Sequence, residues 1–365
     1  MAVIAWIEQQ KTEMTGLKMN TIRVGIIGLG ANTRLRHVPG LRRCENVEIV
    51  SVCNRTPEST QRAASEYGIP KMFNDWPVLV TDDDIDAVVI GTWPYLHCDA
   101  TVAALQAGKH VLVEARMARN ADEAHRMYEV SRQHDNLVAQ IVPSPLGLQV
   151  HQVVKEMLED GYVGELREVV VLGCHPGQAD PSSPLHWRQS AELSGLNMLA
   201  MGILHETLIR WVPDPVRVLA QTQIFTRQRP DPDTNKPVEV GTPDSVHVLT
   251  ELPDGARGVY HLSGVTYHAP PMQIRIFGSE GTLQCVCDPD DRLLAARKGD
   301  SELKDIPVPA SKQGGWRVEE DFIDAIRGGT AIKLTDFKTG VRYMEFTEAV
   351  ARSATDGQAV RLPLE

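Results

Sequence analysis

The chain has 365 residues, which is enough for two domains of ordinary size. Its formal charge is −11 and no basic tract could follow a phosphate backbone, so the composition excludes nucleic-acid binding as the main function. No apolar run reaches membrane-spanning length, and the apolar start, residues 1–7, is too short for a secretory signal. We therefore expect a cytoplasmic protein that binds no membrane, with residues 1–20 as an N-terminal extension.

Five short apolar runs alternate with helical patterns in the first part of the chain. The predicted strands are 22–27, 47–52, 87–90, 110–113 and 137–142, and the predicted helices include 57–67, 99–106 and 120–134. Strands that alternate with helices indicate a doubly wound parallel sheet, and the nearly all-apolar runs fit burial on both faces. We predict a dinucleotide-binding Rossmann domain over residues 21–142, within an α/β protein.

The pattern changes after residue 143. The predicted helices are 149–159, 195–212, 316–327 and 338–354, and the predicted strands are 166–173, 216–225, 245–252, 257–263, 273–277 and 282–286. Residues 227–243 are rich in Pro, Asp and Thr and are predicted to form a long exposed loop. These elements predict an α/β domain with an open, mostly antiparallel sheet over residues 143–365, which would bind substrate and mediate oligomerisation.

The second predicted sheet has apolar residues on both faces. They alternate along the strands 257–263 and 273–277, while helices can cover only one face. We therefore expect a homodimer or homotetramer.

Six cysteines are spread along the chain without a Cys-x-x-Cys pair, which is typical of reduced thiols. Cys285 and Cys287 are two residues apart on a predicted strand, so their side chains should share one face. No second ligand pair has suitable spacing, and we expect no metal site.

The first predicted strand ends in a glycine-rich turn. Gly28 and Gly30 precede a helix that can begin at Asn32, and such glycines let a backbone approach a pyrophosphate at a helix N-terminus. The third glycine of the fingerprint is replaced within Ala31-Asn32-Thr33. A tight turn needs glycine in any case, but the order strand, glycines, helix and strand favours a dinucleotide site at these positions.

The second predicted strand ends in Asn54 and Arg55, where an NAD site usually has an acidic residue for the ribose 2′-hydroxyl. A guanidinium can bind a 2′-phosphate, and no carboxylate at position 54 would repel it. The pair predicts a preference for NADP(H), with NAD(H) as the alternative cofactor. Arg55 as a merely solvated loop residue is the competing interpretation.

The stretch Ala107-Gly108-Lys109-His110-Val111-Leu112-Val113-Glu114 resembles the Gfo/Idh/MocA family of dinucleotide-dependent sugar and polyol oxidoreductases. Further short matches follow in the family's order, at 92–97, 161–166, 187–188 with 194–195, and 277–282. The resemblance runs from about residue 21 to the C-terminus. It implies a Rossmann domain followed by an α/β domain with an open antiparallel sheet.

The resemblance also implies roles for single residues near the cofactor. Thr92, Trp93 and His97 stand in the family's Thr-Pro-x-x-x-His segment beside the nicotinamide, with Trp93 in the usual place of Pro. Glu114 stands at the end of the fourth strand, where the family's cofactor-binding Glu lies.

The positions of the family's three catalytic side chains, and of the Pro after the Lys, depart from the family's pattern. The Glu is usually followed by Lys and Pro, and the Lys usually moves the proton, but this chain has Ala115 and Arg116. The family's catalytic helix carries Asp and His four residues apart, and those positions are Ala200 and Leu204 here. Since positioned acid/base groups contribute ~10²–10⁴-fold to rate, we predict a rebuilt catalytic site.

Four residues are candidates for the missing acid/base. His205 and Glu206 directly follow the empty His position, and a histidine facing a cleft titrates near neutrality, so this pair is the first choice. His175 follows the strand 166–173, and His186 lies on the loop before the catalytic helix. Each has an alternative interpretation, because a lone histidine is commonly structural and a helix carboxylate is commonly solvated.

Four more residues are candidates for substrate binding. Arg116 could bind a carboxylate or a phosphate, and Asn197 is placed on the same helical face as Ala200 for a substrate hydroxyl. Trp187 and Arg188 lie on the loop before that helix, where a pocket wall is the alternative role.

The function we predict is an NAD(P)-dependent oxidoreductase of a sugar, cyclitol or related polyol with a rebuilt catalytic site. Two other functions stay open. One is a redox-assisted glycoside lyase, hydrolase or epimerase with bound cofactor. The other is a non-catalytic sensor that binds nucleotide and sugar.

Overall fold

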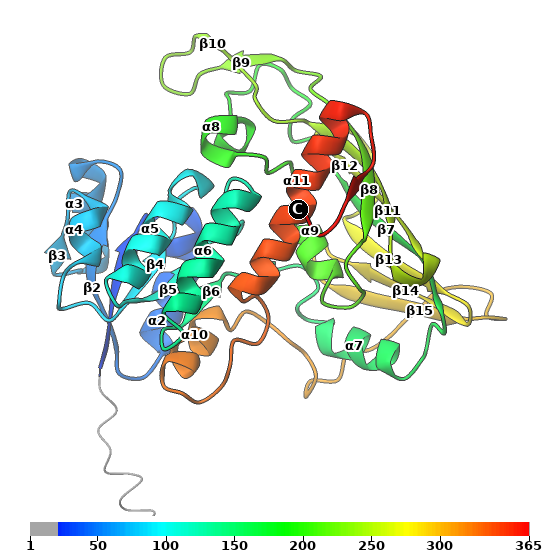
Figure 1. Ribbon diagram of the computed structural model, residues 1–365, viewed down its shortest axis with the longest axis horizontal. Coiled ribbons are helices and arrows are strands. Elements are labelled where there is room, and N and C mark those ends of the chain that lie inside the picture. Colours follow the sequence, from blue (N-terminus) through cyan, green and yellow to red (C-terminus); the bar gives the residue numbers. More distant parts are fainter. Residues whose placement is uncertain (1–20, 365) are drawn as a thin grey trace, which may run out of the picture.

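The computed structural model of the protein describes residues 21–364 and contains two large sheets with a long helix, α11, between them (Figure 1). The first sheet is parallel throughout and has the strand order β3-β2-β1-β4-β5-β6. Its strands are β1 (Ile22–Ile27), β2 (Val47–Cys53), β3 (Lys71–Met72), β4 (Ala87–Ile90), β5 (His110–Val113) and β6 (Ala139–Ile141). This is the predicted Rossmann arrangement, and its strand order reverses between β1 and β4.

Helices cover both faces of the parallel sheet. They are η1 (Thr33–His37) continued by α2 (Val38–Arg43), α3 (Pro57–Tyr67), α4 (Trp76–Val80), α5 (Pro94–Gln106) and α6 (Ala121–Gln133). Local chemistry sets the limits of α3: Thr56 and Ser59 form a capping box at its start, and Gly68 ends it with a φ of 63°.

The second sheet has nine strands in the order β16-β15-β14-β13-β7-β12-β11-β8-β17. All neighbours are antiparallel except β7 and β12. The strands are β7 (Leu166–Cys174), β8 (Arg217–Gln223), β11 (Ser245–Glu251), β12 (Arg257–Ser263), β13 (Gln273–Gly278), β14 (Gly281–Val286), β15 (Arg292–Arg297), β16 (Lys304–Asp305) and β17 (Val360–Arg361). The predicted open, mostly antiparallel sheet is confirmed.

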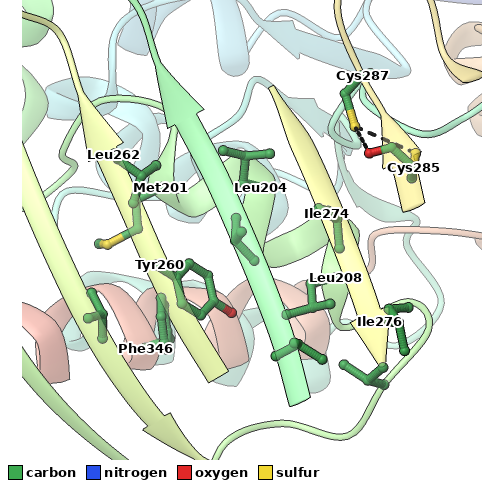
Figure 2. Packing of buried hydrophobic residues seen from close by; sticks show 14 of the residues in the cluster. Met201, Leu204, Leu208, Tyr260, Leu262, Ile274, Ile276, Cys285, Cys287 and Phe346 are labelled. Atoms are coloured by element: carbon green, nitrogen blue, oxygen red, sulfur yellow. Dashed lines mark hydrogen bonds between the residues drawn. The ribbon is translucent and has the colours of Figure 1, made fainter. Parts of the chain in front are cut away.

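One face of the nine-stranded sheet packs on helices and builds the second core. The helices are α7 (His151–Glu159), α9 (Met201–Leu208) and α11 (Phe337–Asp356) (Figure 1). Figure 2 shows how Leu204, Leu208 and Phe346 meet side chains of the strands in this core. The shorter helices α8 (Ala191–Ser194) and η2 (Trp187–Gln189) lie on the connection before α9, and the one-turn η3 (Pro253–Gly255) connects β11 to β12.

The C-terminal segments return to the Rossmann domain. Val318 and Phe322 of α10 (Val318–Ile326) join the core around β1 and β2, and Val341 and Met344 of α11 join the core around β5. The second half of α11, with Phe346, belongs to the core of the second sheet. The predicted domain boundary at residue 143 therefore does not account for α10 and the first half of α11, which pack on the Rossmann domain.

Two predicted segments differ from the structure. Residues 195–212 are not one helix, because Gly195 and Leu199 have φ angles of 65° and 47°, and α9 begins only at Met201. The predicted loop 227–243 contains a short hairpin, β9 (Gln228–Pro230) with β10 (Pro237–Glu239). Among the helices of the described residues, none is long and apolar enough to cross a membrane.

The outer face of the nine-stranded sheet carries neighbouring apolar side chains. Leu249 pairs with Leu219 on one side and with Val259 on the other, and the three side chains are 41–56% exposed. The helices α7, α9 and α11 lie on the opposite face (Figure 1). We propose that a second copy of the chain covers this apolar patch.

A charge in the patch should therefore separate the copies. We expect Leu249→Asp to convert an oligomer into monomers at micromolar concentration, as measured by light scattering. Leu35→Asp is the matched control, because Leu35 is 69% exposed on the Rossmann domain. A wild-type monomer at that concentration would refute the proposal.

Candidate active site

The glycine turn lies where the strand order of the parallel sheet reverses. Gly28 has a φ of 85°, and a Cβ there would come within 2.6 Å of the Thr92 methyl group on the loop after β4. Two helical residues, Ala31 and Asn32, lie between the turn and η1, and both are exposed. The Thr92 hydroxyl is buried without a partner. The turn thus has the close approach and the free polar group that fit a bound dinucleotide.

A pocket of about 460 Å³ extends from this turn along the edge of the sheet. It is lined by residues of the loops after β1, β2 and β4, together with Asn74, Asp75 and Trp76. Asn54 does not present its side chain freely to the pocket. Its carbonyl accepts from Leu29 N (2.7 Å) and its amide donates to Ser59 O (3.0 Å), so it fixes the glycine turn.

A stacked row of four side chains connects the pocket to the second domain. The Arg55 guanidinium lies 5.7 Å from the Trp93 ring, and Trp93 stacks on Trp187 at 5.6 Å with 13° between the planes. Arg188 lies 4.3 Å from the ring of Trp187. The structure therefore brings together two predicted cofactor residues and two predicted substrate residues.

A buried ionic array is formed by His37, on the helix after the glycine turn, with Glu114 and Glu319. This array was not predicted from the sequence. The His37 ring contacts Glu319 through Nδ1 (2.5 Å) and Glu114 through Nε2 (3.0 Å), and Trp316 donates to Glu319 (2.9 Å). Burial acts against protonation, but the two carboxylates raise the pKa of His37 to about 9. Burial likewise opposes ionisation of Glu114, yet the hydrogen bond from His37 lowers its pKa. His37 and Glu114 are therefore both charged at neutral pH.

Glu114 also accepts from Asn32, so the predicted cofactor residues 32 and 114 meet in the structure. Thr33 donates to Gly28 O (3.1 Å) and is buried, which makes it a support of the turn. His97 is fully buried between the carbonyls of Arg116 (2.9 Å) and Thr92 (3.0 Å), and burial lowers its pKa. It holds two loops of the site in place and does not face the pocket.

Arg116 is buried, with 4% of its surface exposed, and its Nε has no hydrogen-bond partner. A Cβ on Gly202 of α9 would come within 2.7 Å of its Cδ. Burial and the nearby Arg188 guanidinium lower the pKa of Arg116 to about 10. The side chain thus extends from the loop after β5 across the start of α9.

The three positions where the resemblance leads one to expect catalytic groups differ in their exposure. Ala115 and Ala200 are partly exposed, whereas Leu204 is fully buried in the second core, where Figure 2 shows it. Along residues 198–209 only Ala200 and Ile203 keep partial exposure. The accessible face of this segment therefore has no titratable side chain.

The expectation that His205 faces the cleft is contradicted. Its ring stacks on Phe346 at 3.6 Å, its Nδ1 lies 2.7 Å from the Tyr260 hydroxyl, and no part of it is exposed. Burial lowers the pKa of His205 to about 3, so it does not titrate near neutrality. Glu206 is engaged with Arg210 (2.6 Å) and accepts from Ser144 N (2.9 Å). Neither residue can serve as the acid/base.

His175 and His186 are exposed, at the end of β7 and before η2. Each ring accepts a backbone hydrogen bond at Nδ1, from Gly177 (3.0 Å) and from Arg188 (3.2 Å) respectively. In the neutral ring the proton then sits on Nε2, which is free to donate. Burial and the Arg188 charge lower the pKa of His186.

The sequence predicted that Asn197 shares a helical face with Ala200, but Asn197 is not on a helix in the structure. It precedes α9, is 1% exposed, and its amide donates to the carbonyls of Ala118 (2.9 Å) and Ser194 (2.7 Å). It therefore joins the loop after β5 to the segment before α9.

The thiols of Cys285 and Cys287 share one face, 3.6 Å apart, and lie near the Asp291 carboxylate. That carboxylate already accepts from the backbone of Gly147 and Gln149. The structure shows no disulfide among the described residues.

Comparison with known proteins places the chain in a family. Residues 22–141 match the oxidoreductase family with an NAD-binding Rossmann fold, and residues 151–284 match the GFO/IDH/MocA C-terminal domain. The chain belongs to the GFO/IDH/MocA family of oxidoreductases. Its first domain is accordingly an NAD-binding domain.

Individual relatives are distant but cover most of the chain. The levoglucosan dehydrogenase of Pseudarthrobacter phenanthrenivorans is 23% identical over 86% of this chain and 89% of its own. A dTDP-3,4-didehydro-2,6-dideoxy-α-D-glucose 3-reductase of Saccharopolyspora spinosa is 27% identical over 85% of this chain and 89% of its own.

Solved structures confirm the fold. A levoglucosan dehydrogenase in complex with NADH and L-sorbose matches with a TM-score of 0.83 and 22% identity, covering 94% of this chain and 99% of that one. An NAD-binding oxidoreductase from Klebsiella pneumoniae matches with a TM-score of 0.82 and 23% identity, covering 94% and 100% of the two chains.

The ionic array beneath the glycine turn generates a stability prediction. The stabilisation from the raised pKa of His37 is complete below its unfolded value of 6.5 and is lost as pH rises through about 9. We expect His37→Gln, which leaves two buried carboxylates, to lower the free energy of unfolding by about 3–5 kcal/mol at pH 7. Denaturant titrations at pH 7 and pH 10 measure the free energy of unfolding. The wild type should lose stability between these pH values because His37 deprotonates, and the variant should lack this component of the loss.

The control is Arg126→Gln, because Arg126 and its partner Asp99 are 58% and 60% exposed and pair at 3.3 Å on the surface. It should cost about 0–1 kcal/mol. Equal costs for the two variants would show that the buried array contributes no special stability.

Proposed function

We propose that the protein is an NAD(P)-dependent oxidoreductase of a sugar, cyclitol or related polyol whose family acid/base is absent. One observation carries this: the cofactor cradle around Gly28 and Thr92 is intact, while the accessible positions 115, 200 and 203 hold no titratable group. The substrate class rests on the relatives, a levoglucosan dehydrogenase and reductases of dTDP-linked sugars.

A bound nicotinamide would accept or give the hydride. The turn at Gly28, the Thr92 hydroxyl and the Asn32–Glu114 pair would hold the dinucleotide, and the Trp93–Trp187 stack would close the site between the domains. Proton exchange would then pass through water, with the exposed side chains of His175 and His186 as the candidate partners. Such exchange lacks the positioning that gives acid/base catalysis its usual gain.

Restoring the lysine tests this proposal. Ala115→Lys places an amine at the family's proton-transfer position, and the neighbouring Arg116 and Arg188 charges would lower its pKa towards the range useful for catalysis. We expect turnover with an accepted polyol to rise by ~10-fold or more. The rate of cofactor reduction, monitored by the fluorescence of the reduced cofactor at a series of pH values, measures the effect.

Ala115→Met is the matched control, because methionine adds a side chain of similar length that has no titratable group. If the Met and Lys variants have equal turnover, proton transfer does not limit the wild type. Product formed without net cofactor change would favour the lyase, hydrolase or epimerase, and cofactor and sugar binding without turnover in any variant would favour the sensor.

We also propose that NADP(H) is preferred. Arg55 is exposed, lines the cofactor pocket and makes no ion pair among the described residues, so it is free for a 2′-phosphate. The Asp75 carboxylate in the same pocket acts against this preference. NADH stays the alternative, since the related levoglucosan dehydrogenase binds NADH.

The test is a calorimetric titration of both reduced cofactors. We expect Arg55→Ala to weaken NADPH binding by ~10-fold or more and to change NADH binding little. Arg62→Ala on α3 is the control, because Arg62 is exposed outside the pocket. Tighter NADH than NADPH binding in the wild type would contradict the proposal.

A further inference from the structure

We propose that Arg116 and Arg188 bind an anionic group of the substrate, a carboxylate or a phosphate, next to the reacting carbon. The natural substrate would then be an anionic sugar or polyol, not a neutral one. This inference rests on the proposed function of the cleft and specifies its substrate class.

Arg116 is buried without a counter-charge. Among the described residues no ion pair or hydrogen bond reaches its guanidinium, and its Nε is enclosed and unpartnered. Two other arginines with buried side chains have partners for their terminal nitrogens: Arg210 pairs with Glu206 at 2.6 Å, and Arg229, whose Nε is also unpartnered, donates to the Asp180 carbonyl at 2.7 Å. A buried charge without a partner is costly, so Arg116 is the exception that calls for an external anion.

Packing holds the Arg116 side chain in place. Gly202 leaves the room through which its Cδ passes, and on its own loop Met117 N donates to the Tyr343 hydroxyl (2.5 Å). A guanidinium that is fixed by packing and has no internal acceptor loses little conformational entropy when it binds an oxyanion, and its planar fork matches two oxygens.

Arg188 supplies a second positive charge from the opposite domain. Its charge is close enough to lower the pKa of Arg116, and it stands on the Trp187 ring without an ion pair in the described part of the chain. The carboxylate nearest in this region, Glu114, is already bonded to His37 and Asn32. The two guanidinium groups therefore repel each other until an anion lies between them.

The position of the pair fixes where on the substrate the anion lies. Arg116 directly follows Ala115, the position of the family's proton-transfer lysine, and its Cδ lies against Gly202 of α9, two residues after the accessible Ala200. An anion held there is adjacent to the carbon that exchanges hydride. A 2-hydroxy or 3-hydroxy sugar acid, or a polyol phosphate, has this arrangement.

Calorimetric titration of the protein saturated with its reduced cofactor tests the inference. The probes are D-gluconate, D-glucitol 6-phosphate and, as the neutral counterpart, D-glucitol. We expect at least one anionic probe to bind ~10-fold or more tightly than D-glucitol, and the tighter of the two identifies carboxylate or phosphate as the group. Equal binding, or no binding of either anion, overturns the inference.

Variants then assign the binding to the pair. We expect Arg116→Met and Arg188→Gln each to weaken the anionic probe by ~10-fold and to leave D-glucitol unchanged. Arg116→Lys should lie between Met and wild type, and Arg62→Gln should have no effect. A thermal unfolding transition like that of the wild type shows that each variant is folded, and anion binding that survives both Arg116→Met and Arg188→Gln overturns the inference.

The readout is separate from the proposed function. Anion binding that depends on both arginines, together with no hydride transfer to or from any polyol, would refute the oxidoreductase while keeping the anion site. Turnover of neutral polyols without anion binding would refute the anion site and support the oxidoreductase.

Discussion

The charged array of Glu114, His37 and Glu319 is the interaction on which the active site depends. It joins the end of β5, the helix after the glycine turn and α10, three segments far apart in the sequence. Burying these charges is tolerable because the histidine is shared by two carboxylates and the fully buried one, Glu319, also accepts from Trp316. The array thereby fixes Glu114 beside Asn32 and sets the shape of the cofactor turn.

On the proposed function, a permanently charged residue stands next to the position where the family's proton carrier is expected. The family's lysine is replaced by Ala115, while the next residue, Arg116, brings a guanidinium to the same loop. Even with its pKa lowered to about 10, an arginine stays charged at neutral pH and moves no proton. On the proposed function, the positive potential is kept while the group that moves the proton is absent, and the proposed anion binding follows from the same replacement.

Local signals in the sequence were sufficient for much of the fold. Strands such as 87–90 are short, apolar and bounded by turns, and α3 carries its own capping box and terminal glycine, so neighbouring residues determine them. The break before α9 was not predictable, because Leu199 gives no turn signal yet has a φ of 47°. The burial of His205 depends on Phe346, which the chain brings to it only through tertiary packing.

The site residues can also be divided into those that local sequence indicates and those that depend on tertiary packing. Gly28 and Arg55 were recognisable from their place in a strand-turn-helix unit, where chain order and space agree. His37 carried no motif, since its partners stand at the ends of other elements, and its charge exists only in the folded protein. The Trp93–Trp187 stack also forms only when the domains meet. Because it links the loop after β4 to the loop that carries Arg188, the position of the substrate loop depends on the Rossmann domain, and cofactor and substrate share one wall.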